Sequence, residues 1–134
     1  MRKFTVIALA LLSGCASSGV RPLRPYEIAT APYRSPASES LVGSLTYEGG
    51  CLLFQSEDGK ALLLPIWPTG TTFEESLVTF HEPAKADQRA IIDEEILLDG
   101  QRSTWAEISD PRFEPFRVQC SAPPFFVSGL TPAN

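Results

Sequence analysis

The chain has 134 residues, of which 43% are hydrophobic, and this length fits one small domain and a leader but not two domains. Its net charge of −5, with no cluster of Lys or Arg, argues against nucleic acid as a partner. GxGxxG, Walker and CxxC motifs are absent from the sequence, so we expect no cofactor.

The first predicted element is an export signal. Met1-Arg2-Lys3 carries two positive side chains and precedes the uncharged run FTVIALALL, residues 4–12. A basic start, a short apolar run and an exit of small residues are typical of a secretory signal peptide. The run is too short to span a bilayer as a helix, which needs about 20 apolar residues.

The exit of this segment resembles the lipobox of bacterial lipoproteins. Leu12-Ser13-Gly14-Cys15 supplies the apolar residue, the two small residues and the cysteine of that motif. The resemblance implies removal of residues 1–14, a diacylglyceryl group on the thiol of Cys15, and acylation of its new amino group. Two or more acyl chains make a stable anchor where one is marginal. The alternative is ordinary cleavage after Ala16-Ser17-Ser18, which would release a soluble exported protein.

The residue that follows Cys15 bears on which membrane holds the anchor. It is Ala16, and not the aspartate that retains many such lipoproteins at the inner membrane. The resemblance therefore implies an anchor in the outer membrane, with the domain on the periplasmic face. Loss of Arg2 and Lys3 with the leader changes the net charge from −5 to −7.

The cysteine count agrees with lipidation. Three cysteines are an odd number for an exported protein. If Cys15 carries lipid, an oxidising compartment predicts a disulfide between Cys51 and Cys120. That bond would close a loop of about 70 residues and contribute roughly 4 kcal/mol in the chain-entropy model. Two buried reduced cysteines are the alternative, and a zinc site would lack ligands because the chain has one histidine.

Residues 15–39 form a predicted tether. The segment after Cys15 holds four prolines and no hydrophobic periodicity, which favours an extended, partly polyproline and disordered linker. Fully extended, it would reach about 75 Å. Its net charge is +1, so that orientation at an anionic surface is one interpretation and a plain solvated spacer is the other.

Residues 40–134 form the predicted β-domain. Period-2 alternation over residues 41–47 places Leu41, Leu45 and Tyr47 on one face. Asp58-Gly59 between two apolar runs predicts an antiparallel hairpin. The hairpin strands are residues 51–56 and 61–66, the turn after them is residues 67–72, and the further strand candidates are residues 76–80, 116–120 (FRVQC) and 125–130.

Residues 87–100 fit two interpretations. Asp87 as an N-cap and Gly100 past a C-terminus would frame a helix. Two short strands around Asp93-Glu94 are favoured by the β-branched isoleucines. From these candidates we expect five to seven short strands in an all-β fold: a small OB-like antiparallel barrel or a sandwich.

Few residues offer chemistry. His81 is the only histidine, HEPAK is not the HExxH zinc motif, and no GxSxG elbow presents a serine. The acidic stretches Glu74-Glu75 and Asp93-Glu94-Glu95 lack the spaced oxygen ligands of a calcium loop, so we expect no metal site. Trp67, at the exit of the hairpin, is the predicted contact residue for a bound peptide, glycan or protein.

These features predict a non-enzymatic, lipid-anchored protein of the cell envelope. Its β-domain would bind or support a periplasmic, outer-membrane or cell-wall partner. The alternative is a small periplasmic hydrolase, or a hydrolase inhibitor with residues 81–90 as its protruding loop.

Overall fold

The computed structural model describes residues 19–132, and the predicted all-β class is confirmed. The lipobox residues Leu12 to Cys15 lie outside this range. The strands are β1 (Ala29–Ala31), β2 (Glu39–Glu48), β3 (Cys51–Ser56), β4 (Leu62–Pro68), β5 (Thr72–Glu74), β6 (Leu77–Phe80), β7 (Gln88–Ile91), β8 (Glu95–Arg102) and β9 (Pro124–Pro132). Between β8 and β9 lie the 3₁₀ turns η1 (Trp105–Glu107) and η2 (Pro111–Phe113) and the helix α2 (Glu114–Cys120).

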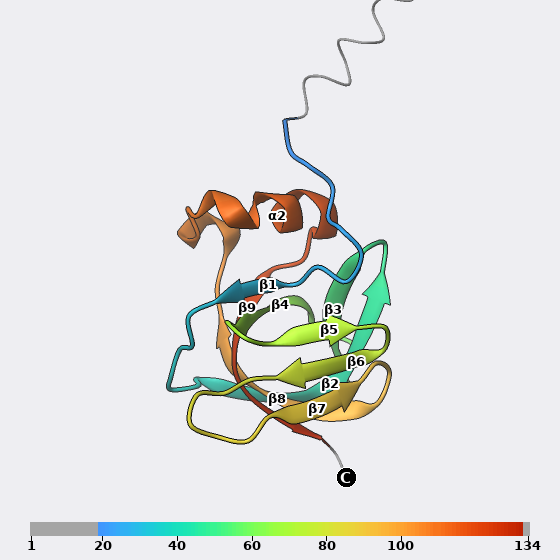
Figure 1. Ribbon diagram of the computed structural model, residues 1–134, viewed down its shortest axis with the longest axis vertical. Coiled ribbons are helices and arrows are strands. Elements are labelled where there is room, and N and C mark those ends of the chain that lie inside the picture. Colours follow the sequence, from blue (N-terminus) through green and yellow to red (C-terminus); the bar gives the residue numbers. More distant parts are fainter. Residues whose placement is uncertain (1–18, 133–134) are drawn as a thin grey trace, which may run out of the picture.

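Five strands form a closed ring of hydrogen-bonded neighbours, in the order β2-β3-β4-β9-β8 and back to β2 (Figure 1). An OB-like barrel, one of the two predicted architectures, is likewise built from five strands. Four of the pairs are antiparallel, whereas β4 and β9 are parallel. The prediction of a purely antiparallel sheet is therefore wrong at this pair, which joins strands far apart in the sequence.

The predicted hairpin forms the first part of this ring. Phe54 of β3 pairs with Leu63 of β4. At the turn, the backbone N–H of Lys60 donates to the Asp58 carboxylate at 2.9 Å. Gly59 has a φ of 75°, a conformation that glycine adopts without steric cost. The turn residues thus hold the register that the flanking apolar runs require.

A second sheet, in the order β5-β6-β7, is inserted between β4 and β8. It settles the ambiguity at residues 87–100, because β7 and β8 are strands with a turn between them where Asp93 has a φ of 74°. With β1 and β5, neither of which was predicted, the described chain has nine strands rather than five to seven. Both additions are three-residue strands, too short to show a period in the sequence.

The second sheet and the ring share one core, which we call the inner core. The β5–β7 sheet contributes Phe73, Val78 and Phe80. The full set of its large members is Leu45, Leu52, Phe54, Leu63, Trp67, Phe73, Val78, Phe80, Ile96, Leu98, Phe125, Val127 and Leu130.

Two glycines leave the space that phenylalanine rings of the inner core occupy. A Cβ on Gly43 of β2 would lie 2.8 Å from the ring of Phe54 and 2.1 Å from the carbonyl oxygen of Gln55. A Cβ on Gly100 of β8 would lie 2.6 Å from the ring of Phe125. Gly100 also follows the register shift in the β8–β9 ladder, so it lies inside a strand and not at the end of one.

The strands β3 and β4 are buried on both faces. Leu52 and Phe54 face the inner core, whereas Cys51 and Leu53 face a second group of apolar side chains outside the ring. Burial on both faces explains why these strands read as continuous apolar runs. The second group, which we call the outer cluster, contains Ala29, Cys51, Leu53, Leu64, Ile66, Phe113, Phe116, Ala122 and Phe126.

The prediction of a disordered tether up to residue 39 is wrong for the described residues. β1 pairs in parallel with β4, with Ala29 opposite Ile66, and Ala29 is 2% exposed. The backbone N–H of Tyr26 donates to the hydroxyl of Tyr47 at 2.9 Å. The prolines exclude a long ladder in this segment, but the six residues between Pro25 and Pro32 leave room for a three-residue strand.

The strand prediction for FRVQC is also wrong, because these residues belong to α2. Pro111 and Pro115 stand at the first turns of η2 and α2, where a proline loses no hydrogen bond. Asp110 caps η2 by accepting from the N–H of Arg112. Phe113, Phe116 and Cys120 recur at helical spacing and all face the outer cluster.

Candidate functional site

Two segments cover the outer faces of β3 and β4: residues 19–31 and residues 105–120, which together we call the cap. Phe113 and Phe116 of the cap pack on Leu53 and Ile66 of the ring in the outer cluster. In OB barrels, the face of the second and third strands is where ligands commonly bind. β3 and β4 are the second and third strands of the ring, and the chain itself covers their outer faces.

A covalent bond joins the cap to the ring. Cys51, the first residue of β3, and Cys120, the last residue of α2, form the predicted disulfide with their Cα atoms 5.7 Å apart. They are 69 residues apart in the sequence. The bond therefore fixes the end of α2 against the start of the second ring strand.

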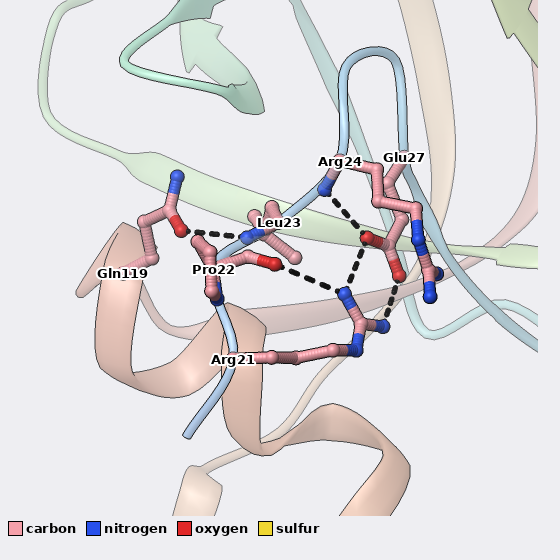
Figure 2. Close-up of polar contacts among 6 residues, drawn as sticks. All are labelled: Arg21, Pro22, Leu23, Arg24, Glu27 and Gln119. Carbon is pink, nitrogen blue, oxygen red and sulfur yellow. Dashed lines mark hydrogen bonds and ion pairs between the residues drawn. The ribbon is translucent and has the colours of Figure 1, made fainter. Parts of the chain in front are cut away.

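The first part of the cap is closed by an ion pair (Figure 2). The Arg21 guanidinium donates two hydrogen bonds to the Glu27 carboxylate, at 2.8 and 2.5 Å. The backbone N–H of Arg24 donates to the same carboxylate at 2.9 Å. These contacts bend residues 21–27 into a loop closed on itself. The hydrogen bond from Arg21 lowers the pKa of Glu27 below its usual value of about 4.5.

A single amide side chain then joins this loop to α2 and the ring. The backbone N–H of Leu23 donates to Oε1 of Gln119 at 3.0 Å, as Figure 2 shows. Nε2 of Gln119 donates to the carbonyl oxygen of Gly49, in the β2–β3 turn, at 2.8 Å. We call the contacts of Arg21, Leu23, Arg24, Glu27 and Gln119 the clasp.

A groove of about 600 Å³ runs between the two segments of the cap. Its charged lining residues are Arg21, Glu27, Arg112 and Glu114, and each is paired with a neighbour of opposite charge. The pKa of Glu114 is lowered by its hydrogen bond with Arg117. The charges lining the groove are therefore engaged in structural pairs, and the arrangement supplies packing and closure rather than an acid–base couple.

Trp67, the predicted contact residue, is 1% exposed, so the prediction that it contacts a partner is wrong. β4 continues through it to Pro68, and the side chain points into the inner core, with its ring 6.2 Å from that of Phe80. Its Nε1 finds no hydrogen-bond partner within residues 19–132. The large apolar ring at the hairpin exit fills the core instead of marking a surface.

His81 lies in the connection between β6 and β7. Its Nδ1 is 3.0 Å from Oδ1 of Asp87, and both side chains are about half exposed, at 43% and 49%. The ring also packs on Gly70, where a Cβ would lie 2.8 Å from it. Glu82 of the same connection pairs with Lys85 and accepts from the Tyr33 hydroxyl at 3.1 Å. The candidate inhibitory loop is thus residues 81–87, since residues 88–90 belong to β7.

The acidic stretches lie at strand ends on the surface. Glu95 of the second stretch interacts with Glu57, which follows β3, and the hydrogen bond between the two carboxyl groups raises the pKa of Glu57. Across residues 19–132, no three His, Cys, Asp or Glu side chains are grouped so as to hold a metal ion. Over the same range, no helix combines the length and apolar character needed to cross a bilayer.

Fold and cap together define the molecule as a ring-shaped β-domain with a disulfide-bonded cap. Comparisons with protein families, with curated proteins and with solved structures find no match to this chain.

The clasp escaped prediction, although one signal for its helix was present. Asp110-Pro111 is a helix-start pattern, and Phe113, Phe116 and Cys120 follow at helical spacing. Nothing local in the sequence indicates that Gln119 accepts from Leu23, because this contact joins residues 96 positions apart.

Proposed function

We propose that this protein is a lipid-anchored component of the bacterial cell envelope, held by Cys15 in the outer membrane with a non-enzymatic β-domain in the periplasm. Its role is to bind or support an envelope protein or the cell wall. The observation that carries the proposal is the Cys51–Cys120 disulfide. It uses two of the three cysteines and leaves Cys15, the lipobox residue, as the odd one.

The arrangement of the cap supports a binding or structural role over catalysis. The usual ligand face of an OB-like ring is filled by the chain's own outer cluster. A partner would therefore contact the loops and the β5–β7 sheet, outside the cap. Charged groups in the groove are engaged in ion pairs that stabilise the cap.

Lipid labelling tests the anchor. Cells that express the protein would be grown with labelled palmitate, and we expect label in the wild type and none in Cys15→Ser. The matched control is the double variant Cys51→Ser, Cys120→Ser, which loses the other two thiols and should still be labelled. Equal labelling of Cys15→Ser would contradict the proposal.

The hydrolase alternative depends on His81. The His81–Asp87 pair is the one feature that favours it, because an imidazole oriented by a carboxylate is a common base. We expect His81→Ala to complement a deletion strain as well as the wild type does. Loss of complementation by a variant that is still folded would support the hydrolase alternative.

A further inference from the structure

We infer that the end of the molecule formed by α2 and the start of the described chain lies against the membrane surface, an inference that rests on the proposed lipidation of Cys15. Figure 1 shows α2 across one end of the molecule beside the start of the described chain, with the end of β9 at the opposite end. Gly19 and Val20 line the same groove as η2 and the first turn of α2. The chain towards Cys15 therefore leaves the domain at its α2 end.

The covalent connection between anchor and domain is short. Ala16, Ser17 and Ser18 separate Cys15 from Gly19, so the Cα atoms of Cys15 and Gly19 lie no more than about 14 Å apart. A fully extended tether to residue 39 would have reached about 75 Å. The clasp and the β1–β4 pairing hold residues 21–31 on the domain and remove most of that length.

A connection this short restricts rotation of the domain. A chain of this length has a radius of gyration of about 13 Å, equivalent to a uniform sphere of about 17 Å radius. The centre of such a sphere cannot come closer to the headgroups than its radius of about 17 Å. A surface point held within about 14 Å of the headgroups therefore lies in the half of the sphere that faces the membrane. α2 lies in that half, whereas β7 lies towards the opposite end (Figure 1).

The charge distribution favours the same orientation. The cap is neutral, with four arginines against four acidic residues. The rest of the chain after Cys15, residues 32–104 and 121–134, carries twelve acidic and five basic residues, a net charge of −7. An anionic lipid surface repels that body and not the cap. Val118, 51% exposed on α2, adds an apolar contact next to Arg117.

Photo-crosslinking to lipid tests the orientation. The full lipidated protein would be reconstituted in vesicles of phosphatidylethanolamine and phosphatidylglycerol, with p-benzoylphenylalanine in place of Val118 or, as the matched control, of Ile91. The two side chains are similarly exposed, at 51% and 46%, and Ile91 is on β7. We expect at least tenfold more lipid adduct for Val118→benzoylphenylalanine. A flexible insertion of about twenty Gly and Ser residues after Ser18 should reduce the difference, since it removes the constraint of the short connection and leaves the charge distribution as the remaining cause.

Intact mass separates the two ways in which the inference can fail. If Cys15 carries its acyl chains and both positions crosslink equally, the orientation is wrong and the proposed anchor stands. If the excess of adduct at position 118 over position 91 is undiminished in the long-linker variant, the role given to the short connection is wrong. If the mass shows no lipid on Cys15, the proposed function and the orientation fall together.

Discussion

The interior of the ring and the cap outside it are held together by different means. The inner core is filled by large side chains from seven strands of the ring and the second sheet. Its central residues are fully buried, since Leu45, Phe54, Val78, Leu98 and Phe125 are all 0% exposed. The outer cluster has fewer buried members and depends on two non-adjacent segments, which are joined to the ring by the β1–β4 pairing, by one disulfide and by Gln119. The ring is stabilised by burial over many strands, and the cap by a few contacts, one of which is covalent.

The difference predicts two levels of stability. All five ring strands contribute to the inner core. Loss of an inner-core side chain should therefore lower the free energy of unfolding of the whole domain. Loss of a cap contact should open residues 19–31 and 105–120 while the ring stays folded. Regions with few buried contacts commonly open with free energies below that of global unfolding.

The largest effect is expected in the inner core. Phe54→Ala removes a side chain with no exposure whose ring also fills the space beside Gly43. We expect a loss of about 3–5 kcal/mol in the free energy of unfolding, measured by urea denaturation, with protection of all strand amides reduced together. Retention of the wild-type midpoint would show that the ring does not depend on this core.

The disulfide should come next and bridges the two regions. Cys51→Ser removes a bond that spans 69 residues, worth about 4 kcal/mol in the chain-entropy model. We expect the melting temperature to fall by more than about ten degrees, since about 1 kcal/mol shifts it by 4–8 °C in a small domain.

The double variant Cys51→Ser, Cys120→Ser is the control for this bond. It should match the single variant, because either change removes the same disulfide, and added reductant should not lower its melting temperature further. Two titratable thiols in the unfolded, unreduced wild-type domain would contradict the pairing.

A smaller and more local effect is expected in the outer cluster. Phe116→Ala should cost about 3 kcal/mol, the low end for a buried phenylalanine, because the site lies at the edge of the molecule and can partly collapse. In hydrogen exchange, the amides of residues 105–120 should lose protection while those of β2 and β8 keep it. A uniform loss across the ring, as expected for Phe54→Ala, would erase the distinction between the two regions.

The smallest effect should be in the clasp, and it should depend on pH. The pKa of Glu27 is lowered, so its stabilising contribution is fully present above its usual value of about 4.5 and is lost as the pH falls through the lowered value. At pH 7, Glu27→Gln should speed proteolysis within residues 19–27 by a factor of about two to five, the size expected for an exposed ion pair. The difference from wild type should vanish at a pH below the lowered pKa. Equal cleavage rates at pH 7 would show that the pair contributes nothing.

The comparison of ring and cap also explains which parts of the fold were predictable. The alternation at residues 41–47 and the Asp58-Gly59 turn are local signals, and β2 and the β3–β4 hairpin formed as they indicate. Burial on one or both faces leaves a period or a continuous apolar run in the sequence. Such patterns are sufficient to place most ring strands.

The cap required information that no local pattern carries. Residues 19–31 have the composition of a linker, yet they form β1 and the clasp. β1 pairs with the part of β4 that lies beyond the β3–β4 pairing, and Gln119 accepts a hydrogen bond from Leu23. FRVQC reads as a strand by composition, whereas the proline positions around it favour α2. Trp67 was misplaced for a related reason, since the sequence does not show that β4 runs on to Pro68. The one contact between ring and cap that the sequence predicted is the Cys51–Cys120 disulfide, which followed from the odd number of cysteines.

The clasp has a mechanical consequence. A pull on the chain ahead of residue 19 loads the Arg21–Glu27 pair and the bond between Leu23 and Gln119. Gln119 adjoins Cys120, so part of that tension passes through the disulfide to Cys51 at the start of β3. The remaining tension reaches β1, which can be stripped from β4 without opening the ring. Force on the N-terminal side is therefore divided between a covalent path and a short strand that can detach first.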